Sequence, residues 1–411
     1  MIKKYTCQNG VRIVLENIPT VRSVAIGLWI KAGSINETES NNGISHFLEH
    51  MFFKGTTTKN AKEIAESFDS IGGQVNAFTS KEYTCYYAKV LDNHASYALN
   101  VLGDMFFNST FDSEELQKER NVVYEEIKMY EDTPDDIVHD LLSKAVYENN
   151  SLAFPILGRE ETLETFTSDT LKQYVHEMYT PDRLVISVAG NVDESFIKEI
   201  EKLFGSYEGG KRENVQQDKP VFHYHTLQKK KETEQAHLCL GYEGLPIGHS
   251  DAYSLIVMNN ILGGSMSSRL FQEVREQRGL AYSVYSYHSG YQDSGLVTIY
   301  GGTGAGQMEV LFQTIQQTID TFKREGITAK ELNNSKEQLK GNLMLSLEST
   351  NSRMSRNGKN ELVLGNHRSL DEIVELIDNV TQDSVAAITN KVFTDEHAMA
   401  FISPIEDWQS K

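Results

Sequence analysis

The chain has 411 residues, of which 39% are hydrophobic and 24% are charged. This composition is that of a folded protein of two or three domains, and it excludes an intrinsically disordered chain. Acidic residues outnumber basic ones by 58 to 39, so the net charge is −19. Because this charge repels phosphate backbones and no Lys/Arg-rich run occurs, we expect no nucleic-acid partner, whereas basic partners would be favoured.

The cysteines and the apolar stretches bear on location. Cys7, Cys85 and Cys239 form no CxxC motif and no disulfide framework, which is typical of a reducing compartment. The apolar stretch 23–30 is too short to cross a bilayer, and the first residues lack the apolar core of a signal peptide. We therefore expect a cytoplasmic protein with no membrane partner.

Strand-like runs and amphipathic helical patterns alternate in groups along the chain. The predicted strands include 11–15, 23–31 and 76–79, and the predicted helices include 42–55, 63–71, 95–108 and 113–131. Because the helices come in pairs between clustered strands, the pattern favours an α+β fold over a strict βαβ alternation. A polar, glycine-containing stretch near the middle has the composition of a linker. We predict an N-terminal domain 1–207, a linker 208–220 and a C-terminal domain 221–411.

The two halves resemble each other. Segments 111–116 and 327–332 each open a helical stretch 216 positions apart, and each follows a strand-like run and a long amphipathic helix. We predict an internal duplication that gives two similar α+β domains, each with a mostly antiparallel sheet covered by helices. Two unrelated α+β domains are the alternative.

The predicted helix 42–55 carries the pattern of a metal site. Asn42 could cap its start and Gly55 could end it. His46, Glu49 and His50 fall at i, i+3 and i+4 on one face, so the two imidazoles can bind one ion. The order H-x-x-E-H is the inverse of the commoner zincin motif. The alternative, two solvated histidines on a polar face, fits poorly with the apolar residues that surround them.

A catalytic zinc needs a third protein ligand, and the predicted helix 113–131 offers acids. On a helical wheel Glu119 and Glu126 lie at the edge of a buried stripe, while Glu125 points to the opposite side. A buried carboxylate needs a partner, and a metal ion with its histidines is one. An amphipathic helix with edge glutamates is the alternative.

The second half lacks this chemistry. With the repeat aligned, Glu119 and Glu126 correspond to Ser335 and Asn342. With an eight-residue gap, the three motif residues His46, Glu49 and His50 correspond to Ser254, Val257 and Met258. One half therefore carries the candidate site and the other keeps the shape.

These motifs resemble the M16 inverzincin metallopeptidases, and in particular the mitochondrial-processing-peptidase-like subfamily with its bacterial processing-protease homologues. The resemblance is carried by His46-Phe-Leu-Glu49-His50, by Glu126 76 positions later, and by the stretches 72–80 and 262–282. It covers essentially the whole chain. In this subfamily the active particle is a dimer of such units. Because one chain here carries both sets of residues, the resemblance implies a homodimer, and a heterodimer with a homologue is the alternative.

The resemblance also implies the roles of individual residues. His46, His50 and Glu126 would bind Zn²⁺, and Glu49 would be the general base. Glu119 would orient a histidine ligand. Further along the chain, the family's substrate-binding Arg and Tyr match Arg275 and Tyr282. An edge strand that holds the substrate matches Asn76, Ala77, Phe78 and Thr79.

We therefore predict a zinc-dependent metalloendopeptidase that hydrolyses peptides or unfolded segments held extended inside a chamber. One alternative is a non-catalytic peptide-binding or scaffolding homologue, which would have lost ligand residues. The other is a zinc amidase on small substrates, which would not depend on an edge strand.

Overall fold

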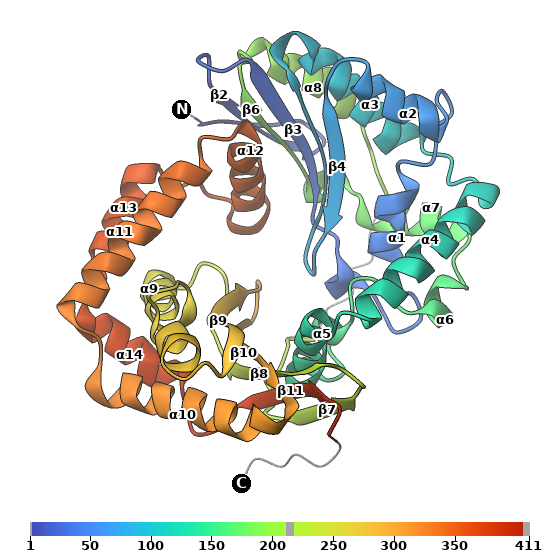
Figure 1. Cartoon of the computed structure of the whole chain (residues 1–411). Helices are drawn as coiled ribbons and strands as arrows, with labels where there is room; N and C mark the ends of the chain where they lie inside the picture. The colour runs from blue at the N-terminus through green and yellow to red at the C-terminus, as the bar shows by residue number, and fades with distance from the viewer. Residues whose placement is uncertain (1, 211–217, 406–411) are drawn as a thin grey trace. The chain divides into compact units, whose positions relative to one another are not determined.

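The computed structural model describes residues 2–210 and 218–405. These residues form two compact units, each built on its own β-sheet (Figure 1). Within the described residues, unit 1 holds 2–128, 154–210 and 345–367, and unit 2 holds 129–153, 218–344 and 368–405.

Unit 1 contains a six-stranded sheet and the helices that cover it. Its strands are β1 (Ile2–Thr6), β2 (Arg12–Asn17), β3 (Ser23–Ile30), β4 (Gln74–Thr79), β5 (Thr84–Leu91) and β6 (Leu184–Gly190). Its helices are α1 (Ile44–Met51), α2 (Ala61–Asp69), α3 (Ala95–Asn108), α4 (Ser113–Glu131, whose last turn belongs to unit 2), α6 (Glu160–Leu163), α7 (Ser168–Met178), α8 (Ser195–Phe204) and α12 (Thr350–Lys359).

Unit 2 contains a five-stranded sheet. Its strands are β7 (Thr226–Lys230), β8 (Gln235–Glu243), β9 (Ala281–Gly290), β10 (Gly295–Gly304) and β11 (Ala398–Ser403). Its helices are α5 (Pro134–Tyr147), α9 (Ala252–Gly263), the π-helix η5 (Phe271–Glu276), α10 (Met308–Glu325), α11 (Ala329–Ser346, whose last two residues belong to unit 1), α13 (Leu370–Asp378) and α14 (Gln382–Val392).

The two sheets have the same topology. The order in unit 1 is β1-β2-β6-β3-β5-β4, and in unit 2 it is β7-β11-β8-β10-β9. Without β1, the orders match strand for strand, and the one parallel pair of each described sheet, β2–β6 or β7–β11, occupies the same place. The prediction of two similar α+β domains with mostly antiparallel sheets is confirmed.

Both faces of the unit 1 sheet are buried, because alternate residues of a strand point to opposite faces. In β3, Ile26 and Leu28 pack into the main core with α1, α3 and α8. Ala25 and Trp29 face the other side, where they pack with Met354 of α12. The Trp29 indole N–H donates to Met354 Sδ at 3.3 Å, and Ser187 Oγ donates to the Met354 carbonyl at 2.8 Å.

The compact units are interleaved along the chain, because each one includes a helix from the other half of the sequence. Helix α5, from the first half of the sequence, packs on β8 and β11 of unit 2, while α12, from the second half, packs on β3 and β6 of unit 1 (Figure 1). The reason is that each helix covers an apolar sheet face that would otherwise be exposed. Most of the predicted linker 208–220 lies outside the described residues. Among the described residues, no helix is both long and apolar enough to cross a lipid bilayer.

Candidate metal centre

The helix that carries the two histidines is shorter than predicted. It spans 44–51 rather than 42–55, because Gly43 has a left-handed conformation (φ 95°) that begins the helix at Ile44. Asn42 does not cap it. The buried carboxylate of Glu37 takes this role instead, accepting the N–H groups of Gly43 at 2.7 Å and Ser45 at 2.9 Å. The apolar face of α1 packs into the core, so the helix and its histidines are fixed in position.

His46, His50 and Glu126 lie together although Glu126 comes from a different helix, α4. The two Nε2 atoms are 3.3 Å apart, and the Glu126 carboxylate oxygens lie 3.8 Å from His46 Nε2 and 3.5 Å from His50 Nε2. Ligands bound at about 2.0–2.2 Å around a tetrahedral zinc ion lie about 3.3–3.6 Å from one another. The spacing and the donor set, two imidazoles and a carboxylate, therefore fit zinc.

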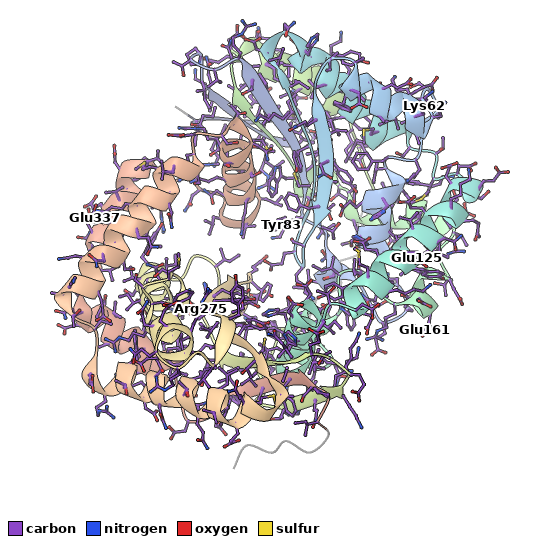
Figure 2. All side chains as sticks on the ribbon, in the orientation of Figure 1. Lys62, Tyr83, Glu125, Glu161, Arg275 and Glu337 are labelled. Carbon is purple, nitrogen blue, oxygen red and sulfur yellow. The ribbon has the colours of Figure 1, made fainter. Side chains whose placement is uncertain are left out.

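Glu119 contacts the triad through His50 but is not one of its three residues. Its Oε1 accepts the hydrogen of His50 Nδ1 at 2.7 Å, and its Oε2 pairs with Lys54 Nζ at 2.5 Å. Only 4% of Glu119 is exposed. Glu125 on the same helix is exposed and pairs with Lys128 instead (Figure 2). Glu119 thus fixes which nitrogen of His50 faces His46 and Glu126.

The electrostatics of the three side chains favour positive charge between them. Burial alone would lower the pKa of His50, but its hydrogen bonds with Glu119 and Glu126 outweigh burial and raise the pKa to about 9. Burial, together with the neighbouring His50, lowers the pKa of His46 to about 4. The hydrogen bond with His50 is the main reason that the pKa of Glu126 is lowered. Two acids therefore surround one readily protonated imidazole, an arrangement that attracts a cation.

Glu49 stands beside the triad without being part of it. Its Oε2 accepts a hydrogen bond from Thr79 Oγ1 of β4 at 2.5 Å. Burial raises the pKa of Glu49, and the bond from Thr79 only partly offsets that rise. β4 is the last strand of its sheet, so the predicted strand 76–79 is a strand and lies at an edge. Thr79, predicted to contact substrate, thus also contacts Glu49.

Unit 2 repeats the helix pair without the ligands. Its α9 and α11 correspond to α1 and α4, and Ser335, at the position of Glu119, accepts a hydrogen bond from Asn260 at 2.9 Å. Ser254, Val257 and Met258 lie on α9. A polar contact between helices thus replaces the metal ligands.

Arg275 and Tyr282 lie side by side in unit 2. Arg275, labelled in Figure 2, is in η5, and its Nη1 donates to the Tyr282 carbonyl at 3.0 Å. Its guanidinium lies 4.4 Å from the centre of the Tyr282 ring. Tyr282 is 77% exposed, so it has no role in the core. The guanidinium also lies near Glu276, with Nε 3.7 Å from its carboxylate, so the ring and the guanidinium form one polar group.

Two models of a known protein family together match most of the chain. The model of insulinase (peptidase family M16) matches residues 12–160, and that of the peptidase M16 inactive domain matches 165–339. The chain belongs to peptidase family M16. The half that matches the inactive domain of M16 is the half in which Ser254, Val257 and Met258 replace the motif.

Relatives and solved structures extend over the whole chain. It is 70% identical to an uncharacterized zinc protease of Bacillus subtilis, YmxG, over 98% of both chains, and 41% identical to an uncharacterized zinc protease of Rickettsia felis over 97% of this chain and 96% of that protein. A protease from Helicobacter pylori has the same fold, with a TM-score of 0.92 at 22% identity over 98% of this chain and 99% of that one. An M16 inactive-domain protein from Pseudomonas fluorescens gives 0.92 at 21% identity, over 99% of each. Both relatives are named zinc proteases, and these names support peptidase activity in this M16 protein.

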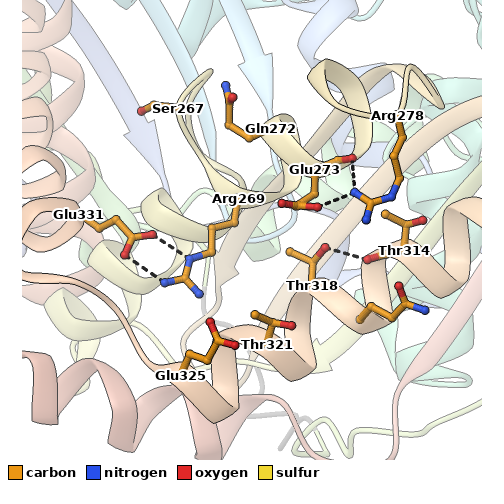
Figure 3. Close-up of a pocket in the computed structure, with 11 residues that line it drawn as sticks. Ser267, Arg269, Gln272, Glu273, Arg278, Thr314, Thr318, Thr321, Glu325 and Glu331 are labelled. Carbon is orange, nitrogen blue, oxygen red and sulfur yellow. Dashed lines mark hydrogen bonds and ion pairs between the residues drawn. The ribbon is translucent and has the colours of Figure 1, made fainter.

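A separate pocket of about 470 Å³ in unit 2 holds none of the predicted site residues (Figure 3). Its two arginines are already paired. Arg269 Nε lies 2.8 Å from Glu331, and Arg278 pairs with Glu273 (Figure 3). Because these charges are neutralised, the pocket offers no free cation for an anionic ligand.

Sequence reasoning missed two residues that support the M16 motif. Glu37, which caps α1, lies in a preceding segment, and no sequence pattern there indicates that its side chain reaches the start of the helix. Lys54, which pairs with Glu119, lies four residues after His50 and one turn beyond the helix. Its position near the motif is the only signal that could have indicated it.

Proposed function

We propose that this M16 protein is a zinc-dependent metalloendopeptidase. The single observation that carries the proposal is the triad of ligand atoms from His46, His50 and Glu126, all within 4.8 Å of one another, with the carboxylate of Glu49 on the same helix face. Bound there, zinc would act as a Lewis acid toward a substrate carbonyl and lower the pKa of a water molecule.

Glu49 is the proposed general base. It would take a proton from the attacking water on a carboxylate oxygen and later give it to the leaving amine nitrogen. Support comes from its burial, which raises its pKa toward the working range of a group that must both accept and donate. Thr79, which donates to Glu49, would hold the carboxylate in one orientation.

The substrate would bind through its backbone. The edge strand with Asn76, Ala77, Phe78 and Thr79 offers backbone groups to an extended peptide. Arg275 and Tyr282 are the proposed donors to the substrate backbone and to the carbonyl oxygen, on which negative charge develops. Backbone binding is largely indifferent to side chains, so the proposal extends to peptides and unfolded segments held in a chamber.

Residues 1–207 would form the zinc-binding domain and 221–411 the domain without metal. It would act as a homodimer in the cytoplasm. Its substrates would include basic peptides, which the net charge of −19 attracts.

The test compares wild type with Glu49→Gln. We expect near-stoichiometric zinc in both proteins, and a loss of turnover on a quenched peptide library of at least about a thousandfold in the variant alone. Glu125→Gln, an exposed glutamate on α4, is the control and should keep full turnover. Full turnover in Glu49→Gln would reject the mechanism. Zinc-loaded wild type without turnover would favour the non-catalytic alternative, and turnover only on short amides would favour the amidase.

A further inference from the structure

A second cluster of metal-ligating side chains lies in unit 2 and shares no residue with the proposed active site. Glu148 follows the last residue of α5, and His223 and His225 lie in the segment that leads into β7. Each offers one ligand atom, and the three atoms all lie within 4.8 Å of one another. None of the three takes part in the proposed peptidase reaction.

The spacing His-x-His places both imidazoles on one side. Side chains two residues apart in an extended segment point in the same direction. The ring centres of His223 and His225 are 5.5 Å apart, and the ring planes meet at 68°. The carboxylate of Glu148 bridges them, with Oε1 3.1 Å from His225 Nδ1 and Oε2 3.6 Å from His223 Nε2. Ligands around a tetrahedral ion lie about 3.3–3.6 Å from one another. The separation at His223 falls within this range, and the one at His225 lies just below it.

The backbone holds all three residues in place. The His223 N–H donates to the Val146 carbonyl at 2.9 Å, and the His225 carbonyl accepts from the Met399 N–H of β11 at 2.9 Å. Glu148 is one of two described non-glycine residues with a positive φ, 47°. Backbone strain of this kind persists where surrounding structure fixes it. The ligand set is therefore built from anchored segments rather than from free side chains.

We propose that Glu148, His223 and His225 form a second site for a divalent cation of the zinc class. Neutral imidazole with one carboxylate is the donor set that zinc and its neighbours in the first transition series prefer. The His225 side chain is 54% exposed, so solvent can complete the coordination. The site joins the end of α5 to the approach to β7, and thus a helix from the first half of the sequence to a strand of the second. Its role is structural.

The experiment counts zinc in tag-free full-length protein, equilibrated with micromolar free zinc and then analysed by mass spectrometry. We expect two ions per chain in wild type and one in His225→Asn, with unchanged peptide turnover in that variant. The variant should also lose the rise in thermal midpoint that this second ion gives. His249→Asn replaces a histidine near Asp251 that lies outside the cluster, and it should keep both ions. Equal zinc content in wild type and His225→Asn would overturn the proposal.

A second variant isolates the site. The double variant His46→Asn/His50→Asn removes the proposed active-site ligands, so any ion that remains should be held by the second cluster. We expect one ion per chain, with an affinity that falls at least about tenfold when Glu148→Gln is added. No bound zinc in a folded double variant would also overturn the proposal. Because turnover and the second ion are measured separately, failure here leaves the proposed peptidase untouched.

Discussion

His50 is engaged at both ring nitrogens. Its Nδ1 faces Glu119 at 2.7 Å, which leaves Nε2 directed at His46 and Glu126. Lys54 in turn holds the other oxygen of Glu119. This chain of contacts orients the imidazole before any ion binds, so less freedom is lost on binding.

Glu119→Gln tests whether these contacts support zinc binding. The amide keeps the shape but loses the charge that supports His50, so we expect zinc affinity to fall about 10- to 100-fold. Competition with a chelator measures this change. Glu125→Gln is the matched control on the same helix. An unchanged affinity in Glu119→Gln would show that His50 needs no support.

The sequence pattern predicted the relative positions of the side chains within the motif helix. The i, i+3, i+4 spacing brings His46, Glu49 and His50 to one face, as the structure has them. The wheel could not separate Glu119 from Glu126, because both lie at the same edge of the stripe. Only the packing of α4 against α1 distinguishes them. Their catalytic roles stay predictions.

The edge strand β4 is the element on which substrate binding rests. The Ala77 N–H donates to Asn76 Oδ1 at 2.8 Å, a side-chain partner rather than β5. Proline is tolerated at an edge where the N–H does not serve the ladder. We expect Ala77→Pro to fold and to raise KM for long peptides about tenfold, since a bound peptide can no longer take over this N–H from Asn76. Amides too short to add a strand should be unaffected. Equal effects on both substrates would exclude strand addition.

The start of α11 is stabilised by a charge pair. Glu331 accepts hydrogen bonds from Arg269 at 2.8 and 3.0 Å and from the Thr328 N–H at 2.7 Å. Burial alone would raise the pKa of Glu331, but these hydrogen bonds lower it to about 2, against 4.5 in an exposed chain. The folded state therefore gains stability above pH 4.5 and loses it as the pH falls through 2.

We expect Glu331→Gln to unfold more easily than wild type at pH 7, by about 1–2 kcal/mol after allowance for partial exposure. Glutamine can still accept the capping hydrogen bond, so the loss reports the charge. The difference in unfolding free energy should shrink toward zero as pH approaches 2. Denaturant unfolding at pH 7 and pH 3 measures it. A difference independent of pH would contradict the assigned charge pair.

Each half of the sequence contributes one helix to the compact unit formed mainly by the other half. Helix α5 from the first half belongs to unit 2, and α12 from the second half belongs to unit 1. The duplication was predictable, because similar segments recur in the sequence 216 residues apart. The exchange was not, because an apolar helix face does not specify which of two similar sheets it covers. Matching topology makes both choices sterically similar, and only tertiary packing selects one.

Met354→Ala tests the exchange. The side chain is fully buried beneath the sheet of unit 1 and contacts Trp29. Its truncation should cost about 2–5 kcal/mol of unfolding free energy, from lost burial and the cavity left behind. Ser355→Ala, the next residue on α12, should cost little. Equal and small losses in both variants would mean that α12 does not pack on this sheet.

The central claim is that His46, His50 and Glu126 hold one zinc ion. Anomalous diffraction at the zinc edge, from crystals of the active protein, tests it most directly. We expect a peak about 2.0–2.2 Å from both Nε2 atoms and a Glu126 oxygen. Active crystals with no peak at that position would contradict the claim.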